Sequence, residues 1–421
     1  MEKRKLDAVK ILVWLSRLIV GLTFIVSGWA KSVDPWGFIY KIEEYFNVWD
    51  VVVPRELTLA LAIAISITEF VIGIMLTFGI MRRVSAWLAA AFMVVLLPLT
   101  AYIAVADPVS DCGCFGDFII ISNVATLIKN IILTGFIIVL LLRNDAVTGI
   151  YTQSIQWLVI FGAIAYSGVL NFVGCRYQPL MDFRPYPVDS KLVFTSSEHS
   201  DEDDEGVFIY KKNGEEQSFS VDQLPDSTWT FVRAEFSNNA KDNRLTVFDG
   251  DEDVTDMIFN GMGEQLIVVV IDPGIRYLTR ARLANELYRY MSARNGEMFA
   301  LVAAEGDDLE AWQQLALPEY MAYSAEDTSL KELVRGDAGL IYLRDGKIIW
   351  KRNLASVSHD AIKAAAHKDI DLLNDDLDLN LERFNYVIMI VFFAWLLIIF
   401  SLNYPGKILG RYFSSDSAKN L

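Results

Sequence analysis

The chain has 421 residues, of which 53% are hydrophobic and 21% charged, and its net charge is −16. Soluble domains are about 45–50% apolar and about 25% charged, so this composition disfavours a purely soluble enzyme. The acidity argues against binding of nucleic acid, because contacts with phosphate require a basic surface. Residues 176–384 hold 22 Lys and Arg against 40 Asp and Glu, whereas the remainder holds 15 against 13. The sequence therefore divides into an apolar, near-neutral part and an acidic, water-soluble part.

Six stretches of the apolar part are long enough to be membrane-spanning helices, which need about 20 mostly apolar residues. They lie at residues 11–30, 57–80, 84–105, 122–142, 155–175 and 384–403. No small-residue cleavage site follows the first stretch, so we interpret it as an uncleaved anchor rather than a signal peptide. The sequence predicts a multi-pass protein in a lipid bilayer.

The basic residues of the short connections predict the orientation of these helices. Lys and Arg gather before the first stretch, at Arg82 and Arg83, at Arg143, and after the sixth stretch. Six crossings place all four segments on one side, which the positive-inside rule assigns to the cytoplasm. We expect a bacterial inner-membrane protein with both termini in the cytoplasm and residues 176–384 in the periplasm.

The chain has three cysteines, Cys112, Cys114 and Cys175, and this topology places all three on the periplasmic side, where disulfides persist. A zinc site needs about four ligands, and no histidine lies nearby in the sequence, so we predict no metal site. A structural disulfide from Cys175 to either of the other two leaves one thiol over. A third interpretation, besides a metal site and a structural disulfide, is thiol–disulfide exchange. Cys112 and Cys114 would be the exchanging pair, and Cys175 would be the resolving cysteine. A disulfide across the single residue Gly113 closes a small strained ring, and strain favours exchange.

Three charged residues fall inside the predicted membrane helices: Arg17, Glu69 and Lys129. Such residues are costly in a bilayer and are usually paired. In one hypothesis they form a polar pocket that relays protons or binds the head group of a quinone, the one candidate cofactor. In the alternative, Arg17 reaches toward the inner face and Glu69 hydrogen-bonds a neighbour to fix the packing.

Several motifs in residues 8–145 resemble the DoxX family and its MauE-like branch. They are Ser16–Gly21, Ser27–Pro35, Glu69–Gly73 with Gly79, and the Cys112–Gly116 loop. The resemblance implies a four-helix membrane bundle that takes part in periplasmic disulfide formation or electron transfer, often beside a thioredoxin-like partner. It also implies that Cys112 and Cys114 are redox residues and that Arg17, Lys31 and Glu69 are polar positions typical of the family.

The acidic part begins with a Pro-rich and acidic linker, after which Val207–Tyr210 and Gln217–Val221 flank an Asn-Gly turn that predicts a hairpin. Further strands are expected at 228–236 and 244–248. From residue 265 we expect strands at 265–271, 298–303, 339–343 and 347–351, with helices at 277–294, 307–315 and 359–373. This β-α-β-α-β-β-α order resembles the thioredoxin fold. However, Asp272-Pro273-Gly274-Ile275 stands where that fold carries Cys-x-x-Cys, so the domain cannot exchange thiols by itself.

The predicted fold class is a membrane all-α protein, with a DoxX-like four-helix bundle and two further transmembrane helices, joined to an α/β thioredoxin-like periplasmic domain. The expected segments are the bundle (1–150), the fifth helix (151–176), the linker (177–206), a hairpin-rich subdomain (207–261), the thioredoxin-like domain (262–375), and the sixth helix with its tail (376–421).

Two functions are compatible with the sequence. The first is thiol–disulfide exchange or electron transfer in support of periplasmic protein maturation. The second is a non-catalytic scaffold of an inner-membrane complex, whose redox-inactive domain binds a periplasmic partner. The third cysteine favours the first function, and the missing Cys-x-x-Cys favours the second.

Overall fold

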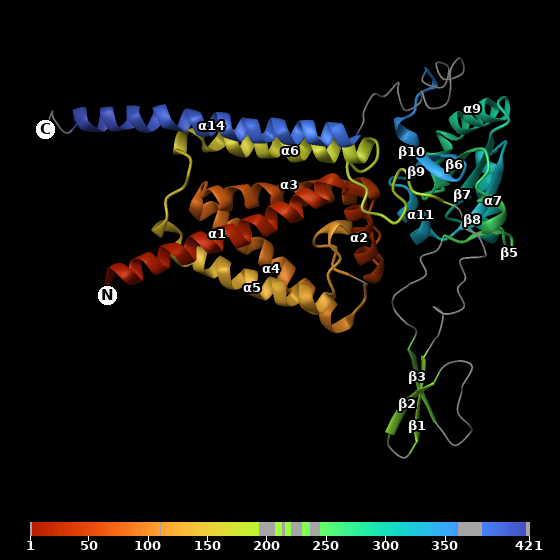
Figure 1. Ribbon diagram of the computed structural model, residues 1–421, viewed down its shortest axis with the longest axis horizontal. Helices are drawn as coiled ribbons and strands as arrows, with labels where there is room; N and C mark the ends of the chain where they lie inside the picture. Colours follow the sequence, from red (N-terminus) through yellow and green to blue (C-terminus); the bar gives the residue numbers. More distant parts are fainter. Residues whose placement is uncertain are drawn as a thin grey trace. The chain divides into compact units, whose positions relative to one another are not determined.

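The computed structural model describes residues 2–109, 111–192, 207–212, 215–219, 230–235, 245–360 and 381–417. The chain separates into two compact units: Met1–Pro185 with Arg352–Leu421, and Tyr186–Lys351. The first unit is helical and the second is built on β-sheets (Figure 1).

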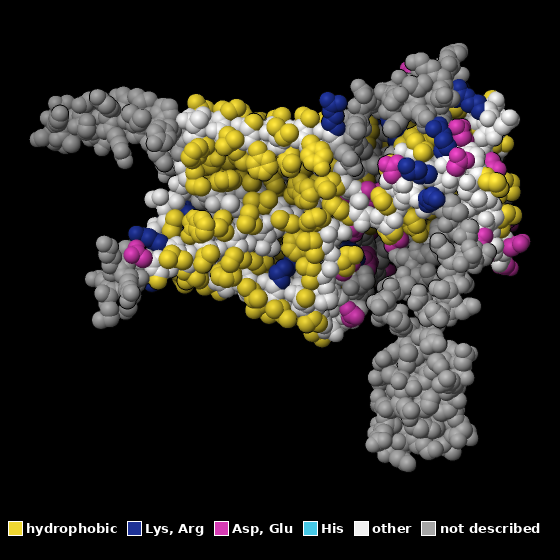
Figure 2. Space-filling model, in the orientation of Figure 1, with side chains coloured by type: hydrophobic (Ala, Val, Ile, Leu, Met, Phe, Trp, Pro, Cys, Tyr) yellow, Lys and Arg dark blue, Asp and Glu magenta, His cyan; other side chains and the backbone are white. Residues whose placement is uncertain are grey.

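Among the described residues, six helices are long and apolar enough to cross a membrane, which confirms the six predicted stretches. They are α1 (Glu2–Val33), α3 (Arg55–Phe78), α4 (Arg82–Ala106), α5 (Asn123–Arg143), α6 (Gln156–Arg176) and α14 (Leu381–Ser417). Large apolar side chains such as Trp87, Val94 and Phe161 are 67–74% exposed on these helices. Figure 2 shows hydrophobic side chains covering the visible face of the helical unit. An apolar surface of this extent is suited to lipid, and the chain is a multi-pass membrane protein.

Among the described residues, the helical unit has two large cores and a small cluster of Tyr45, Ile103 and Val109. In the first, α1, α3, α4 and α5 bury residues such as Val20, Ile72 and Leu140. In the second, α3, α6 and α14 meet around Phe70, Tyr166 and Phe392, and the rings of Tyr166 and Phe392 stack at 4.4 Å. The fifth and sixth membrane helices are therefore packed onto a four-helix bundle, side by side along it (Figure 1).

The helices α1 and α3 approach each other at glycines. A Cβ atom at Gly28 would lie 2.4 Å from the amide nitrogen of Phe70, and one at Gly73 would lie 2.5 Å from that of Ile25. Small residues let two membrane helices come close enough for polar side chains to pair across them. This close contact brings α1 and α3 together near Lys31 and Glu69.

A further helix, α2 (Pro35–Val48), was not predicted by the sequence analysis. Its N-terminus is fixed by Asp34, whose carboxylate accepts a hydrogen bond from Gly37 N at 3.0 Å, and by Pro35 in the first turn. Its apolar face buries Trp36, Ile39 and Tyr45, among others. It therefore packs on the end of the bundle at which α1 ends and α3 begins. Short 3₁₀ turns connect other helices: η1 (Gly116–Phe118), η2 (Asn144–Ala146) and η3 (Gln153–Ile155).

The second unit contains a mixed seven-stranded sheet in the order β10-β9-β6-β7-β8-β4-β5. The strands are β4 (Val247–Asp249), β5 (Glu252–Asp253), β6 (Glu264–Val270), β7 (Glu297–Val302), β8 (Met321–Ala325), β9 (Ala338–Arg344) and β10 (Lys347–Asn353). The strands β6, β7 and β8 are parallel, and β9 is antiparallel to β6. The central strand β6 is almost entirely buried, as its continuous apolar sequence predicts. Asp345 and Gly346 both have positive φ in the turn between β9 and β10, as a type I′ hairpin requires.

Helices α8 (Ile275–Leu278), α9 (Ala281–Ser292), α10 (Gly306–Ala316) and α11 (Asp327–Leu333) complete this unit with the short α7 (Thr255–Ile258). The predicted parallel pair is confirmed as β6 with β7, and the predicted hairpin strands β9 and β10 are neighbours in the sheet. The helix expected at 307–315 is α10, and the one expected at 277–294 is divided into α8 and α9. The strand β8 and the helix α11 were not predicted. The strand β8 pairs in parallel with β7 on one side and antiparallel with β4 on the other. Most of the helix expected at 359–373 lies outside the described residues.

The strands β1 (Val207–Lys212), β2 (Glu215–Phe219) and β3 (Thr230–Glu235) form a separate antiparallel sheet in the order β2-β1-β3. The pairing of Lys212 with Glu215 confirms the predicted hairpin.

The close approach of α1 and α3 gives the first testable prediction. Gly28→Ala should lower the stability of the detergent-solubilised protein by about 1–3 kcal/mol, because the added methyl group meets the backbone of α3. Gly135→Ala is the matched control, since a Cβ at Gly135 on α5 contacts nothing within 4 Å. Thermal unfolding followed by size-exclusion chromatography measures both. Equal melting temperatures for the two variants would contradict the packing described here.

Candidate functional site

The loop between α4 and α5 brings two cysteines together. The Sγ atoms of Cys112 and Cys114 lie 2.7 Å apart, and both cysteines are free thiols. Gly113 between them has φ of 64°, and a Cβ there would lie 2.5 Å from the side chain of Lys41. Its amide donates to the carboxylate of Asp111 at 2.7 Å. The tight turn therefore depends on glycine both for its backbone conformation and for the close contact with α2.

The helix α2 holds this loop from one side. The hydroxyl of Tyr45 donates to the carbonyl of Cys112 at 2.9 Å. The ammonium of Lys41 bridges Glu44 at 2.7 Å and Asp111 at 3.1 Å. The loop is thus fixed by a hydrogen bond to one cysteine and an ion pair beside it.

A buried ion pair holds the loop from the other side. Lys31 Nζ on α1 lies 2.7 Å from Glu69 Oε2 on α3, and the two side chains are only 4% and 5% exposed. Ser27 Oγ lies 2.8 Å from the same carboxylate oxygen, 2.9 Å from Lys31 Nζ and 2.6 Å from the carbonyl of Cys114. Ser27 therefore links the Lys31–Glu69 ion pair to the backbone of Cys114, one of the two candidate redox cysteines.

A second cation lies close to the two thiols. The ammonium of Lys129 on α5 is 4.4 Å from the centre of the Phe115 ring, and that of Lys31 is 4.9 Å from the Phe38 ring. Aromatic faces attract cations, so Phe115 fixes the Lys129 charge next to the cysteine loop.

These neighbours give the two thiols different acidities. The hydrogen bond from Cys112 lowers the pKa of Cys114 to about 7, with the charges of Lys129 and Lys31 acting in the same direction. The pKa of Cys112 is raised, because its thiol proton is held by Cys114 and its sulfur is buried. At neutral pH the arrangement supplies a thiolate at Cys114 and a thiol donor at Cys112. A thiolate with a pKa near neutrality is a competent nucleophile toward disulfides.

The predicted site residues do not form a single cluster. The structure brings together Cys112, Cys114, Lys129 and Glu69 at the α2 end of the bundle, and adds Lys31 as the partner of Glu69. Arg17 lies 14 residues before Lys31 on α1, about 21 Å away along the helix axis.

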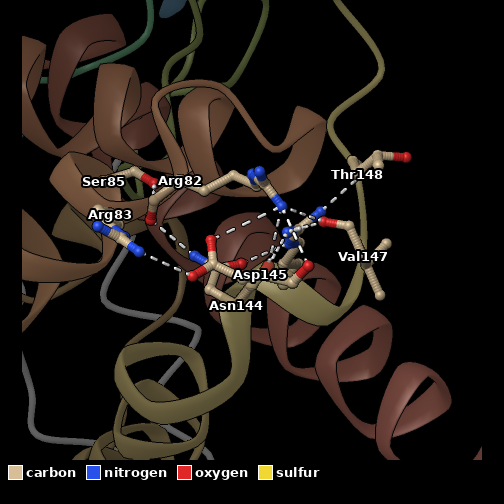
Figure 3. Close-up of polar contacts among 8 residues, drawn as sticks. Arg82, Arg83, Ser85, Asn144, Asp145, Val147 and Thr148 are labelled. Carbon is tan, nitrogen blue, oxygen red and sulfur yellow. Dashed lines mark hydrogen bonds and ion pairs between the residues drawn. The ribbon is translucent and has the colours of Figure 1, made fainter. Parts of the chain in front are cut away.

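At its own end of the bundle, Arg17 is a packing residue. Its guanidinium donates to the side chain and carbonyl of Asn144, both at 2.8 Å, and to the carbonyls of Val147 and Thr148. Figure 3 shows Arg82, Asn144, Asp145 and Val147 converging at this position. Arg17 therefore has no part in a shared polar pocket with Glu69. As in the alternative hypothesis, Arg17 bonds loop carbonyls at its own end of the bundle, and Glu69 hydrogen-bonds a neighbour, Ser27, beside Lys31.

Cys175 lies near the end of α6, where its carbonyl accepts a hydrogen bond from the Trp36 indole at 3.2 Å. In the described residues it makes no sulfur contact with Cys112 or Cys114. Its role as a resolving thiol stays a prediction.

The described residues contain no group of three or more His, Cys, Asp or Glu side chains that could hold a metal ion. The expected quinone stays a prediction too.

Three site residues were missed or given no role by the sequence analysis: Ser27, Lys41 and Tyr45. Two signals could have found them. Ser27 and Lys31 are four residues apart, which places them on one face of α1. The Asp34-Pro35 pair is a helix start, and the apolar spacing after it indicates the amphipathic helix that carries Lys41 and Tyr45.

Comparison with known families identifies a part of the chain. Residues 9–143 match the family model described as Methylamine utilisation protein MauE. Residues 205–236 match a model described as a domain of unknown function, DUF8463. No match was found among the curated proteins or among the solved structures. The chain is thus a membrane protein whose first four membrane helices are similar to MauE.

The unequal acidities of the two thiols can be measured directly. The alkylation rate of Cys114 by iodoacetamide should rise with pH through a midpoint near 7, whereas Cys112 should react slowly over that range. In Cys112→Ala the midpoint of Cys114 should rise by about one unit or more, because the largest stabiliser of its thiolate is removed. Cys175→Ser is the control and should leave the midpoint unchanged. Mass spectrometry of the labelled peptides separates the sites, and an unperturbed midpoint near 8.5 for Cys114 would contradict the geometry.

Proposed function

We propose that this protein exchanges thiols and disulfides with a protein partner through Cys112 and Cys114. The observation that carries the proposal is the contact of the two sulfurs at 2.7 Å, with the lower pKa at Cys114. Residues 9–143 match the model of a methylamine utilisation protein, MauE. The resemblance to that branch implies a part in periplasmic disulfide formation or electron transfer, which agrees with the proposal.

The exchange has two balanced steps. The Cys114 thiolate attacks one sulfur of the partner's disulfide, forms a mixed disulfide and releases the other partner sulfur as a thiolate, which takes a proton from water. Cys112 then loses its proton to water and attacks Cys114 Sγ, which forms the Cys112–Cys114 disulfide and releases the second partner thiol. The partner gains two electrons and, from water, two protons. The loop loses two electrons and the one proton of Cys112, because Cys114 starts as a thiolate, so the solvent supplies one net proton. The reverse sequence oxidises a partner dithiol.

The orientation belongs to the same proposal. Basic residues gather at the end of the bundle that carries Arg82, Arg83 and Arg143. The cysteine loop lies at the other end, after α4. We infer that the loop faces the periplasm of a bacterial inner membrane, where disulfides persist, and that the domain between α6 and α14 faces the same compartment.

The sheet unit suits a binding role in this scheme. Its β6-β7 and β9-β10 pairs follow the order of a thioredoxin-like domain, but residues 176–384 contain no cysteine. The turn after β6 is Asp272-Pro273-Gly274, in which the amide of Gly274 donates to Asp272 at 3.0 Å. We propose that this domain recruits the partner and leaves the chemistry to the membrane loop.

A scaffold is the second candidate function, and the lack of cysteine in the sheet unit favours it. In a scaffold, Cys112 and Cys114 have no exchange role, and partners remain bound whatever the state of the thiols.

Oxidised glutathione separates the two functions. In Cys112→Ser the second step is blocked, so Cys114 should accumulate a mixed disulfide with glutathione near neutral pH. The wild type should instead end as the Cys112–Cys114 disulfide with glutathione released, and Cys114→Ser should trap much less. The three proteins are held in nanodiscs, and intact-protein mass spectrometry measures the fraction of each that carries glutathione. If Cys112→Ser and Cys114→Ser trap glutathione equally slowly, exchange is excluded and the scaffold is favoured.

A further inference from the structure

The ion pair below the cysteine loop has no direct part in the exchange just proposed. Lys31 and Glu69 are almost completely buried, and neither makes a hydrogen bond to a cysteine sulfur in the described structure. A buried ion pair generally stabilises a fold no better than apolar side chains of the same size. Its location directly beneath Cys114 therefore points to a role at the loop rather than to packing alone.

We propose that Lys31 and Glu69, tied to Cys114 through Ser27, are positioning residues that set the charge on the Cys114 sulfur in opposite directions. This inference rests on the proposed exchange function. Lys31 favours the thiolate, Glu69 opposes it, and their pairing holds the reactivity of Cys114 between the two extremes.

The connection runs through one hydroxyl group. Ser27 Oγ has a single proton and two acceptors, Glu69 Oε2 at 2.8 Å and the carbonyl of Cys114 at 2.6 Å. It also accepts a hydrogen bond from Lys31 Nζ at 2.9 Å. Any movement of the Cys114 backbone is thus coupled to the hydrogen bonding of the ion pair. Ser27 fixes the distance over which the two charges act on the sulfur.

The electrostatic signs follow from the charges. Lys31 lowers the pKa of Cys114 and Glu69 raises it, after the larger effect of the Cys112 hydrogen bond. Charges in a weakly screened interior act strongly on a neighbouring group, but an ion pair largely cancels its own field. When either Lys31 or Glu69 is neutralised, the charge of the remaining residue acts on Cys114 without cancellation. The other charged groups around the loop, which remain in every variant tested, are Lys129 on α5, Lys41 and Glu44 on α2, and Asp111 in the loop itself.

The experiment compares four proteins in nanodiscs, all with Cys175→Ser. They are the unmodified site, Glu69→Gln, the double variant Lys31→Met with Glu69→Gln, and Ser27→Ala. The pH midpoint of Cys114 alkylation is measured in each. Glu69→Gln should lower the midpoint by about one unit, since Lys31 then acts without its counter-charge. The double variant should have a higher midpoint than Glu69→Gln by a similar amount, and it leaves no buried carboxylate unpaired.

In Ser27→Ala the midpoint should rise, because the carbonyl of Cys114 loses the hydrogen bond through which Ser27 holds it near Lys31. Arg83→Met is the control for loss of a charge, as Arg83 is 83% exposed and lies at the other end of α4. Its midpoint should equal that of the unmodified site.

Shifts of opposite sign for the two charges support the inference. Equal midpoints in all variants, or shifts of the same sign for both charges, would overturn it and leave the pair with a packing role. Trapping of glutathione by Cys112→Ser is scored separately. If glutathione is trapped while the midpoints do not move, only the inference fails; if the midpoints move while nothing is trapped, the exchange function fails.

Discussion

The buried pairing of Lys31 with Glu69 is the constraint on which the rest of the site depends. It requires α1 and α3 to approach closely, which the glycines Gly28 and Gly73 permit. Because a lone charge in a membrane interior is costly, each residue fixes the position of the other. Ser27 extends this arrangement to Cys114, so the geometry of the cysteine loop is inherited from the helix packing below it. Farther toward the start of α1, Arg17 is held differently, by hydrogen bonds to Asn144 and Val147.

Much of the membrane fold could be predicted from the sequence, because length and hydropathy determine which segments can cross a bilayer. The six spans were identified, and so were the alternating strands and helices of the sheet unit. The strand β8 was missed because Met321–Ala325 has weak strand propensity of its own. Its pairing with β7 and β4 comes from tertiary context, which a local pattern does not contain.

The site was only partly predictable. Periodicity places a charge inside a helix but does not choose its partner among several helices, so Glu69 could not be assigned to Lys31 rather than Arg17. Lys31 was at the margin of the first apolar stretch, where a basic residue is ordinarily assumed to reach the interface. The helix α2 is too short to span a membrane and was not predicted, and so Lys41 and Tyr45 were not identified as site residues. The proximity of Cys112 and Cys114 follows from their spacing along the chain, because only Gly113 lies between them. The position of Cys175 depends on the packing of α6, which the sequence pattern does not give.

We propose that Cys112 and Cys114 are oxidised and reduced together as one two-electron unit, by an exchange that needs no bond to Cys175. It is tested most directly by equilibrating the full-length protein in nanodiscs with glutathione redox buffers and quantifying the free thiol at each cysteine by mass spectrometry. We expect Cys112 and Cys114 to be oxidised together, with a tenfold change in the ratio of disulfide to dithiol for about 30 mV, while Cys175 stays reduced. Oxidation of Cys175 together with one of the two, with the other remaining a free thiol, would contradict the proposed exchange.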